Sequence, residues 1–134
     1  MNAKPFLDTN IVVYAFSSND SRNVKAEALL EAGGIISVQV LNEFVSVSRR
    51  KQRRNWNEVN DALGALKILL DPPQPLTLEL HEAAVTIARD HGFPIYDGLI
   101  IAAALRAECA ILYSEDFQHG LAIGPLTICN PFVD

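Results

Sequence analysis

The chain has 134 residues, of which 49% are hydrophobic and 20% are charged, a balance typical of a globular protein and unlike that of a disordered one. Its length fits one domain over residues 1–134, and no apolar stretch approaches the roughly 18 residues that a membrane span requires. Residues 1–5 also lack the apolar core of a signal peptide, and we expect no membrane attachment. Cys109 and Cys129 show neither metal-binding nor disulfide-framework spacing, which favours buried, reduced thiols and so a cytoplasmic protein.

The net charge is −5, which does not by itself indicate a nucleic-acid-binding protein, but the basic residues are unevenly distributed. Segment 49–54 holds five of the 11 Lys and Arg residues. Such a run can contact phosphates. It can equally be the solvated end of a helix, where cations favour the negative end of the dipole. Both interpretations fit the sequence.

Short apolar runs alternate with helical patterns, which predicts an α/β fold with a parallel sheet flanked by helices. In chain order we expect a strand at 6–7, a helix at 11–16 capped by Thr9 or Asn10, a helix that Ser21 caps and Gly33–Gly34 ends, and a strand at 35–36. Helices at 38–53 and 56–70 follow, then a proline-rich stop at 71–75, an extended segment at 76–78 and a helix at 79–91. A helix at 96–107 is apolar almost all round, which predicts burial on more than one side. Strands at 110–113 and 126–129 complete the sheet.

Four acidic residues lie where an apolar run gives way to polar residues or to a helix start, namely Asp8, Glu43, Asp97 and Asp116. Open α/β sheets bind ligands beyond the carboxyl ends of their strands, and Asp8 and Asp116 follow two predicted strands there. Asp97 lies in the first turn of the helix at 96–107, and Glu43 lies about one turn into the helix at 38–53. Strand alternation puts Glu115 and Asp116 on opposite sides, and we assign the inward position to Asp116.

Carboxylates that converge in this way repel one another, since two unit charges about 4 Å apart cost on the order of 4 kcal/mol at an effective dielectric constant near 20. A divalent cation relieves the repulsion, and hard oxygen ligands favour Mg²⁺ or Mn²⁺. Thr9, Asn10 and Ser114 are candidates for orienting the carboxylates or waters around such an ion, although each can simply cap a helix or form a turn. Taken singly, each of the four carboxylates also has a structural explanation: Asp8 and Asp97 can cap helices, Asp116 can be a turn residue, and Glu43 can be an exposed helix residue. Their convergence favours a metal-dependent phosphodiesterase that activates water, and among these a ribonuclease.

The basic run can be related to this site by helical geometry. At about 100° per residue, Arg50 and Arg54 return to within about 20° of the direction of Glu43 if the helix persists that far. We therefore predict that both arginines guide an RNA backbone toward the metal. The three histidines lack metal-ligand spacing and are expected to be structural or exposed; they are His81, His91 and His119.

At these positions the chain resembles a PIN domain, specifically the VapC-type ribonuclease toxin of bacterial toxin–antitoxin pairs. The matching segments are 6–10 (FLDTN), 37–44 (SVQVLNEF), 96–100 (YDGLI), 112–120 (LYSEDFQHG) and 130–132 (NPF). The resemblance implies a three-layer α/β sandwich with a central, mostly parallel sheet, and a Mg²⁺- or Mn²⁺-dependent endoribonuclease site. It carries over catalytic roles to the acidic quartet, with Asp8 and Asp97 as the first choice of direct metal ligands and Asp116 as the next. It further implies a homodimer and a cognate antitoxin whose C-terminal segment blocks the site.

Two other classes of protein compete with this interpretation. An aspartyl-nucleophile phosphatase would use Asp8, but Asn10 occupies the place of its second, proton-exchanging Asp, and the last lysine is Lys67, so a receiver domain lacks its late lysine. A non-catalytic module would use the carboxylates for a structural metal or a protein interface. A structure-specific DNA nuclease of the same broad fold is a further alternative, although the chain is short for additional DNA-binding elements.

Overall fold

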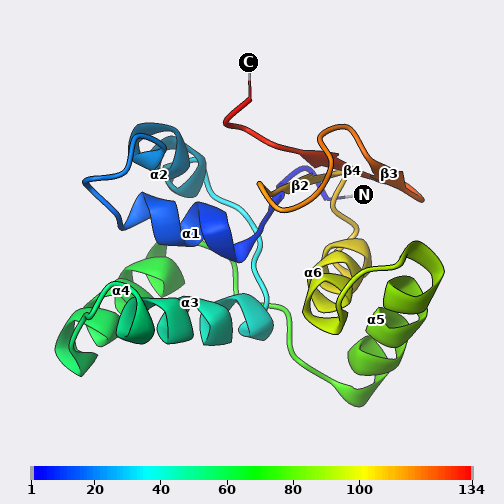
Figure 1. Ribbon diagram of the computed structural model, residues 1–134, viewed down its shortest axis with the longest axis horizontal. Coiled ribbons are helices and arrows are strands. Elements are labelled where there is room, and N and C mark those ends of the chain that lie inside the picture. Colours follow the sequence, from blue (N-terminus) through cyan, green and yellow to red (C-terminus); the bar gives the residue numbers. More distant parts are fainter. Residues whose placement is uncertain (1, 134) are drawn as a thin grey trace.

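The computed structural model describes residues 2–133, and Figure 1 shows a small sheet with α1 and α2 to one side of it and α5 and α6 beneath it. In chain order its elements are β1 (Phe6–Leu7), α1 (Thr9–Ala15), α2 (Asn23–Glu31), α3 (Val38–Arg50), α4 (Trp56–Leu69), α5 (Leu78–His91), α6 (Ile95–Arg106), β2 (Ile111–Tyr113), β3 (Ala122–Ile123) and β4 (Leu126–Cys129).

The sheet has the strand order β1-β2-β4-β3. Strand β2 pairs in parallel with both β1 and β4, while β3 and β4 form an antiparallel hairpin. In this register Leu7 pairs with Tyr113 and Tyr113 with Cys129, so the carboxyl ends of three strands are level. The fold is therefore α/β with a mostly parallel sheet, as the sequence predicts, and its strand ends provide one shared edge.

The helices pack against one another in a connected series: α1 contacts α2 and α3, α3 contacts α4 and α6, and α5 contacts α6. Helix α6 also contacts strand β2 of the sheet. Seven consecutive residues of α6, Gly98–Ala104, are buried, which confirms the prediction of a helix covered on more than one side. The approach of α5 is so close that a Cβ atom at Gly98 would lie 2.6 Å from the carbonyl oxygen of Ala84. This contact fixes the first turn of α6 against the rest of the fold.

Several sequence expectations are wrong in detail. The predicted strand at 35–36 is reduced to a single bridge between Ile35 and Phe6, because the next helix begins at Val38 and leaves no length for a ladder. Strand β3 was not expected, and α5 begins at Leu78 within the segment expected to be extended. Helix α1 begins at Thr9, with Asp8 as its N-cap. Helix α2 follows Arg22 without any side-chain cap, so the predicted cap at Ser21 is absent.

Helix α3 ends three residues earlier than predicted. Lys51 is its C-cap residue, and Arg53 has a left-handed backbone with φ 53°, a conformation that no α-helix continues through. Cys109 is buried and Cys129 is half-buried, and both are free thiols. Within residues 2–133, every helix is too short or too polar to span a lipid bilayer.

Candidate functional site

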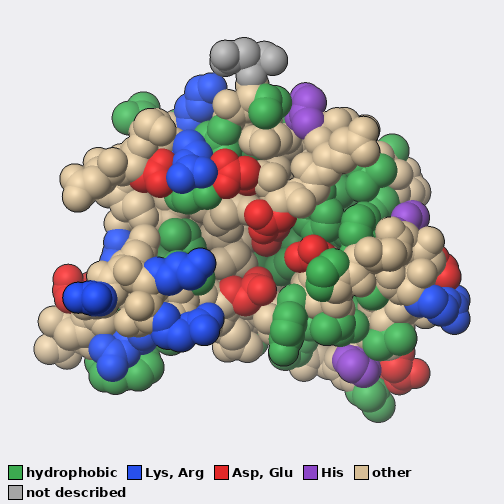
Figure 2. All heavy atoms as spheres, viewed as in Figure 1, with side chains coloured by type: hydrophobic (Ala, Val, Ile, Leu, Met, Phe, Trp, Pro, Cys, Tyr) green, Lys and Arg blue, Asp and Glu red, His purple; other side chains and the backbone are tan. Residues whose placement is uncertain are grey.

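The four predicted carboxylates line one cavity of about 410 Å³, hereafter the acidic cavity, together with Thr9 and Asn10. Figure 2 shows acidic side chains gathered at the centre of this face, with basic side chains to one side of them. Asp8 follows β1, Asp116 lies beyond β2, Glu43 projects from α3, and Asp97 lies in the first turn of α6. Residues up to 108 positions apart in sequence thus meet at the carboxyl edge of the sheet.

Asp8 is held at this edge by both its backbone and its side chain. Its N–H group donates to the carbonyl of Tyr113 at 3.0 Å, which extends the β1–β2 pairing by one residue. One carboxylate oxygen accepts from the N–H group of Thr9 at 2.7 Å, and the other accepts from the Ser114 hydroxyl at 2.6 Å. Asp8 is only 4% exposed, and this burial raises its pKa to about 7 despite both hydrogen bonds, with Asp116 and Glu43 adding repulsion.

Thr9 and Ser114 connect the carboxylates into one hydrogen-bonded chain. The Thr9 hydroxyl donates to Glu43 Oε1 at 2.7 Å, while its backbone N–H binds Asp8. Ser114 is fully buried, and its hydroxyl also accepts from the backbone N–H of Asp116 at 3.1 Å. A continuous network of hydrogen bonds therefore runs from Glu43 through Thr9, Asp8 and Ser114 to the backbone N–H of Asp116. In it, neutral groups position three acidic residues.

Glu43 and Asp97 both line the acidic cavity. Burial raises the pKa of Glu43, and the Asp97 and Asp116 carboxylates raise it further, against the opposing effect of the Thr9 hydroxyl and the Gln39 side chain. Burial also raises the pKa of Asp97, and Asp116 adds to this. Asp116 thus raises the pKa of Asp8, Glu43 and Asp97, and the higher pKa of these three groups favours their protonated form.

The donor set fits a hard divalent cation. Within residues 2–133, no ion pair joins any of the four carboxylates to a basic side chain, so their charges are uncompensated. No three of the described Asp, Glu, His or Cys side chains stand close enough together to form a ready-made metal cage. An ion such as Mg²⁺ retains several waters and uses only one or two direct carboxylates, which suits an open cavity of this kind. The buried amide nitrogen of Asn10 has no hydrogen-bond partner among the described residues, and it can donate to a carboxylate or to a metal-bound water.

Glu115, the sequence neighbour of Asp116, is directed away from the acidic cavity. Its carboxylate forms an ion pair with Arg22 at 2.9 Å and accepts a hydrogen bond from the Tyr14 hydroxyl. The guanidinium of Arg22 lies over the Tyr14 ring at 3.8 Å. Burial and the neighbouring Glu115 carboxylate raise the pKa of Tyr14 to about 12. Asp116, which lines the cavity, is therefore the carboxylate that this loop presents to the site.

The basic residues behave differently from one another. Arg50 lines a second cavity of about 510 Å³ that shares Glu43 with the acidic cavity. The expected placement of Arg54 is wrong because α3 ends at Arg50; the Arg54 guanidinium donates to the carbonyl of Phe16 instead. Lys51 lines the acidic cavity and was missed, since the only signal for it was its membership of the basic run.

The histidines take no part in the acidic cavity. All three are exposed; His91 stacks on Phe93, and His119 Nδ1 accepts from the N–H group of Asn130 at 2.9 Å. The prediction that they are structural or exposed is confirmed.

Comparison with known proteins agrees with this geometry. No curated protein matches the sequence, but solved structures share the fold. VapC20 of Mycobacterium tuberculosis, described as a sarcin–ricin-loop-cleaving toxin, superposes with a TM-score of 0.68 at 19% identity, over 83% of this chain and 88% of that one. A toxin–antitoxin complex from Klebsiella pneumoniae gives a TM-score of 0.70 at 20% identity, over 96% and 98% of the two chains. VapBC2 from Rickettsia felis, bound to a promoter DNA fragment, gives 0.63 at 22% identity, over 92% and 95%.

The model of the PIN domain family matches residues 6–120, which include all four carboxylates of the acidic cavity. With most of its length matched and its fold shared with VapC structures, this chain belongs to the PIN domain family.

Proposed function

We propose that the protein is a metal-dependent endoribonuclease, the toxin of a toxin–antitoxin pair, that hydrolyses RNA phosphodiester bonds in the cytoplasm. The observation that carries the proposal is the acidic cavity itself, where four carboxylates face one another without a basic side chain paired to any of them. Carboxylates alone would repel a phosphodiester, so a cation has to mediate between them and the substrate. The structural likeness to a toxin described as cleaving the sarcin–ricin loop supports RNA as the substrate.

The roles of the residues follow from their surroundings. Asp8, Asp97 and Asp116 would hold Mg²⁺ or Mn²⁺, one or two of them directly and the rest through bound water. When bound, the ion supplies an activated water and neutralises charge on the leaving oxygen. Thr9 and Ser114 keep the Asp8 and Glu43 carboxylates oriented through the hydrogen bonds described above.

Three further residues act on protons and phosphates. Glu43, whose pKa is raised, is suited to accept and return a proton at the cavity wall. Lys51 and Arg50, on the basic side of the site, would bind the phosphates flanking the cleaved bond.

Cleavage assays on single-stranded RNA with Mg²⁺ or Mn²⁺ test the proposal. We expect Asp8→Asn and Asp97→Asn each to reduce cleavage by roughly a hundredfold or more, while Asp61→Asn, at an exposed position on α4, leaves it unchanged. Equal cleavage by wild type and both site variants would refute the assignment. So would the absence of cleavage by folded wild-type protein across a broad RNA panel.

An antitoxin partner and a homodimer are part of the proposal. Two structural neighbours are toxin–antitoxin assemblies, and the acidic surface of this chain suits a basic inhibitory segment. Co-expression with the product of an adjacent short reading frame should give a complex in which RNA cleavage is suppressed, and light scattering should give twice the chain mass for the isolated protein. Uninhibited cleavage by a formed complex would contradict the antitoxin role.

A further inference from the structure

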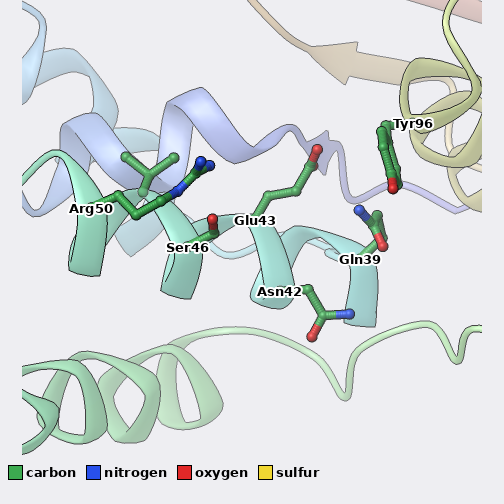
Figure 3. Close-up of a pocket in the computed structure, with 7 residues that line it drawn as sticks. Gln39, Asn42, Glu43, Ser46, Arg50 and Tyr96 are labelled. Atoms are coloured by element: carbon green, nitrogen blue, oxygen red, sulfur yellow. The ribbon is translucent and has the colours of Figure 1, made fainter.

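The cavity beside the acidic cavity combines features that suit a nucleobase. It lies between α3 and the start of α6, holds about 510 Å³ and is lined by Gln39, Asn42, Ser46, Arg50 and Tyr96 besides the shared Glu43 and Val47. Figure 3 shows Tyr96 approaching from α6 while Glu43 and Gln39 extend toward it from α3. Tyr96 directly precedes the proposed metal ligand Asp97 on α6, and their side chains line these two neighbouring cavities. We call this space the side cavity.

The Tyr96 ring is available for stacking. It is 58% exposed, and it takes part in none of the ring–ring or cation–π contacts among residues 2–133. Trp56 is similarly exposed at 57%, but the Arg49 guanidinium already lies 4.5 Å from its ring centre. An exposed ring with a free face beside a phosphodiester site is an arrangement that nucleases and single-strand-binding proteins use to stack unpaired bases.

Arg50 is the member of the basic run best placed to hold a phosphate in the side cavity. Arg49 is engaged with Trp56 and with the carbonyl of Arg54, and Arg54 donates to the carbonyl of Phe16. Arg50 is exposed, forms no ion pair with any described residue and lines the side cavity. Gln39 and Asn42 add amide donors and acceptors, which can bind base edges.

We propose that the side cavity binds a single unpaired RNA base adjacent to the cleaved phosphodiester, with the base stacked on Tyr96 and its phosphate held by Arg50. The proposal rests on the proposed ribonuclease function and specifies its substrate class as single-stranded or splayed-out RNA. A duplex, whose bases are stacked inside the helix, would not present a base to this cavity.

Binding of a defined probe tests the role of the ring. The probe is fluorescein-labelled oligoadenylate of about 12 nucleotides, within the range of site sizes for single-strand binding, compared with a chain of equal length whose nucleosides are replaced by abasic units. Anisotropy is measured with Mg²⁺ in the Asp8→Asn background, which prevents turnover. We expect Tyr96→Ala to weaken oligoadenylate binding about tenfold and to leave abasic binding unchanged. Tyr96→Phe keeps the ring and should bind like its parent.

Two controls separate stacking from charge and from general loss of surface. Arg50→Ala should weaken both probes to the same extent, because it removes a phosphate contact. Trp56→Ala removes an equally exposed ring outside the side cavity and should change neither. Three outcomes would each overturn the proposal. Tyr96→Ala could weaken the binding of both probes equally, Trp56→Ala could weaken binding as much as Tyr96→Ala does, or the parent protein could fail to bind oligoadenylate.

Cleavage assays on the protein with Asp8 intact distinguish a failure of the base site from a failure of the nuclease proposal. If that protein cleaves RNA while Tyr96→Ala has an unchanged KM and kcat, the base site is refuted and the nuclease stands. If Tyr96→Ala loses base-dependent binding while the intact protein cleaves no RNA, the base site stands and the nuclease is refuted.

Discussion

Replacing Asp8 by Asn should stabilise the fold at alkaline pH while abolishing the proposed function. The Asp8 carboxyl has a pKa of about 7 in the folded protein against an ordinary value of 3.8, chiefly because it is buried. Since the folded state holds this proton more tightly than the unfolded chain, the stability linked to Asp8 is fully present below about pH 3.8 and is lost as the pH rises through about 7. At about 1.4 kcal/mol per pKa unit, the loss is on the order of 4 kcal/mol at pH 8 and about 2 kcal/mol at pH 5.

Asparagine removes the buried charge but keeps an oxygen for the Thr9 N–H group. The NH₂ group of the asparagine meets a Ser114 hydroxyl that already accepts a hydrogen bond from the backbone N–H of Asp116, so one hydrogen bond worth about 1 kcal/mol is weakened. The net gain in the free energy of unfolding should therefore be about 3 kcal/mol at pH 8 and about 1 kcal/mol at pH 5.

Urea denaturation followed by far-ultraviolet circular dichroism in metal-free buffer measures this difference. Asp61→Asn, an exposed substitution on α4, is the matched control and should shift neither value. A gain that is equal at the two pH values, or a variant less stable than wild type at pH 8, would show that burial of the Asp8 charge is not what destabilises the fold.

The same reasoning predicts the response to metal. A cation that binds the folded carboxylates but not the unfolded chain stabilises wild type by about 2.7 kcal/mol at a concentration 100 times its dissociation constant. Mg²⁺ or Mn²⁺ should therefore raise the wild-type unfolding midpoint at pH 8 and raise that of Asp8→Asn much less, whereas Na⁺ at equal ionic strength should not separate the two proteins. Equal shifts with all three ions would argue against a specific site.

Two further substitutions test how the site is supported. Gly98→Ala should destabilise the protein by about 1–3 kcal/mol, because the new Cβ would lie 2.6 Å from the Ala84 carbonyl oxygen and force α6 away from α5. The control Gly64→Ala, on α4 with nothing within 4 Å of the new Cβ, should instead be neutral or stabilising by up to about 1 kcal/mol. Equal effects of the two substitutions in denaturant titrations would contradict the close helix contact. Glu115→Gln should lower the pKa of Tyr14 from about 12, since the neighbouring Glu115 carboxylate contributes to raising it; ultraviolet absorbance titration measures this, and an unchanged phenol pKa would exclude the contact.

The sequence was sufficient to predict the convergence of the carboxylates because parallel strands impose it. Asp8 and Ser114 follow strands whose ends are level, with Leu7 paired to Tyr113, and Asp116 lies two residues further on in a bend, where its backbone N–H donates to the Ser114 hydroxyl. The helix patterns likewise located Asp97 in the first turn of its helix and Glu43 in the second turn of its own. These inferences depend only on local periodicity and on the rule that ligand sites lie beyond the carboxyl edge of the sheet.

The errors arise where a tertiary contact decides the local conformation. The end of α3 depends on a left-handed residue, Arg53, and on the contact of Arg54 with Phe16, neither of which has a sequence signature. The missed strand β3 did have one, since Gly124–Pro125 is a turn signal between two apolar pairs, and Gly124 has a positive φ of 55°. The position of Lys51 in the wall of the acidic cavity depends on this early end of α3 and could not be inferred without it.

Adjacent acidic residues receive different environments in this fold, and Arg22 explains how. Its guanidinium is paired with Glu115 and Asp20 and covered by the Tyr14 ring, so the charge of Glu115 is neutralised outside the acidic cavity. Its neighbour Asp116 has no basic partner among the described residues and faces the other carboxylates. Two carboxylates of the acidic quartet, Asp8 and Glu43, accept hydrogen bonds from neutral donors, which orient them without cancelling their charge. The fold thus retains an electrostatically costly arrangement at one place, which agrees with the proposal that the negative charge binds a cation.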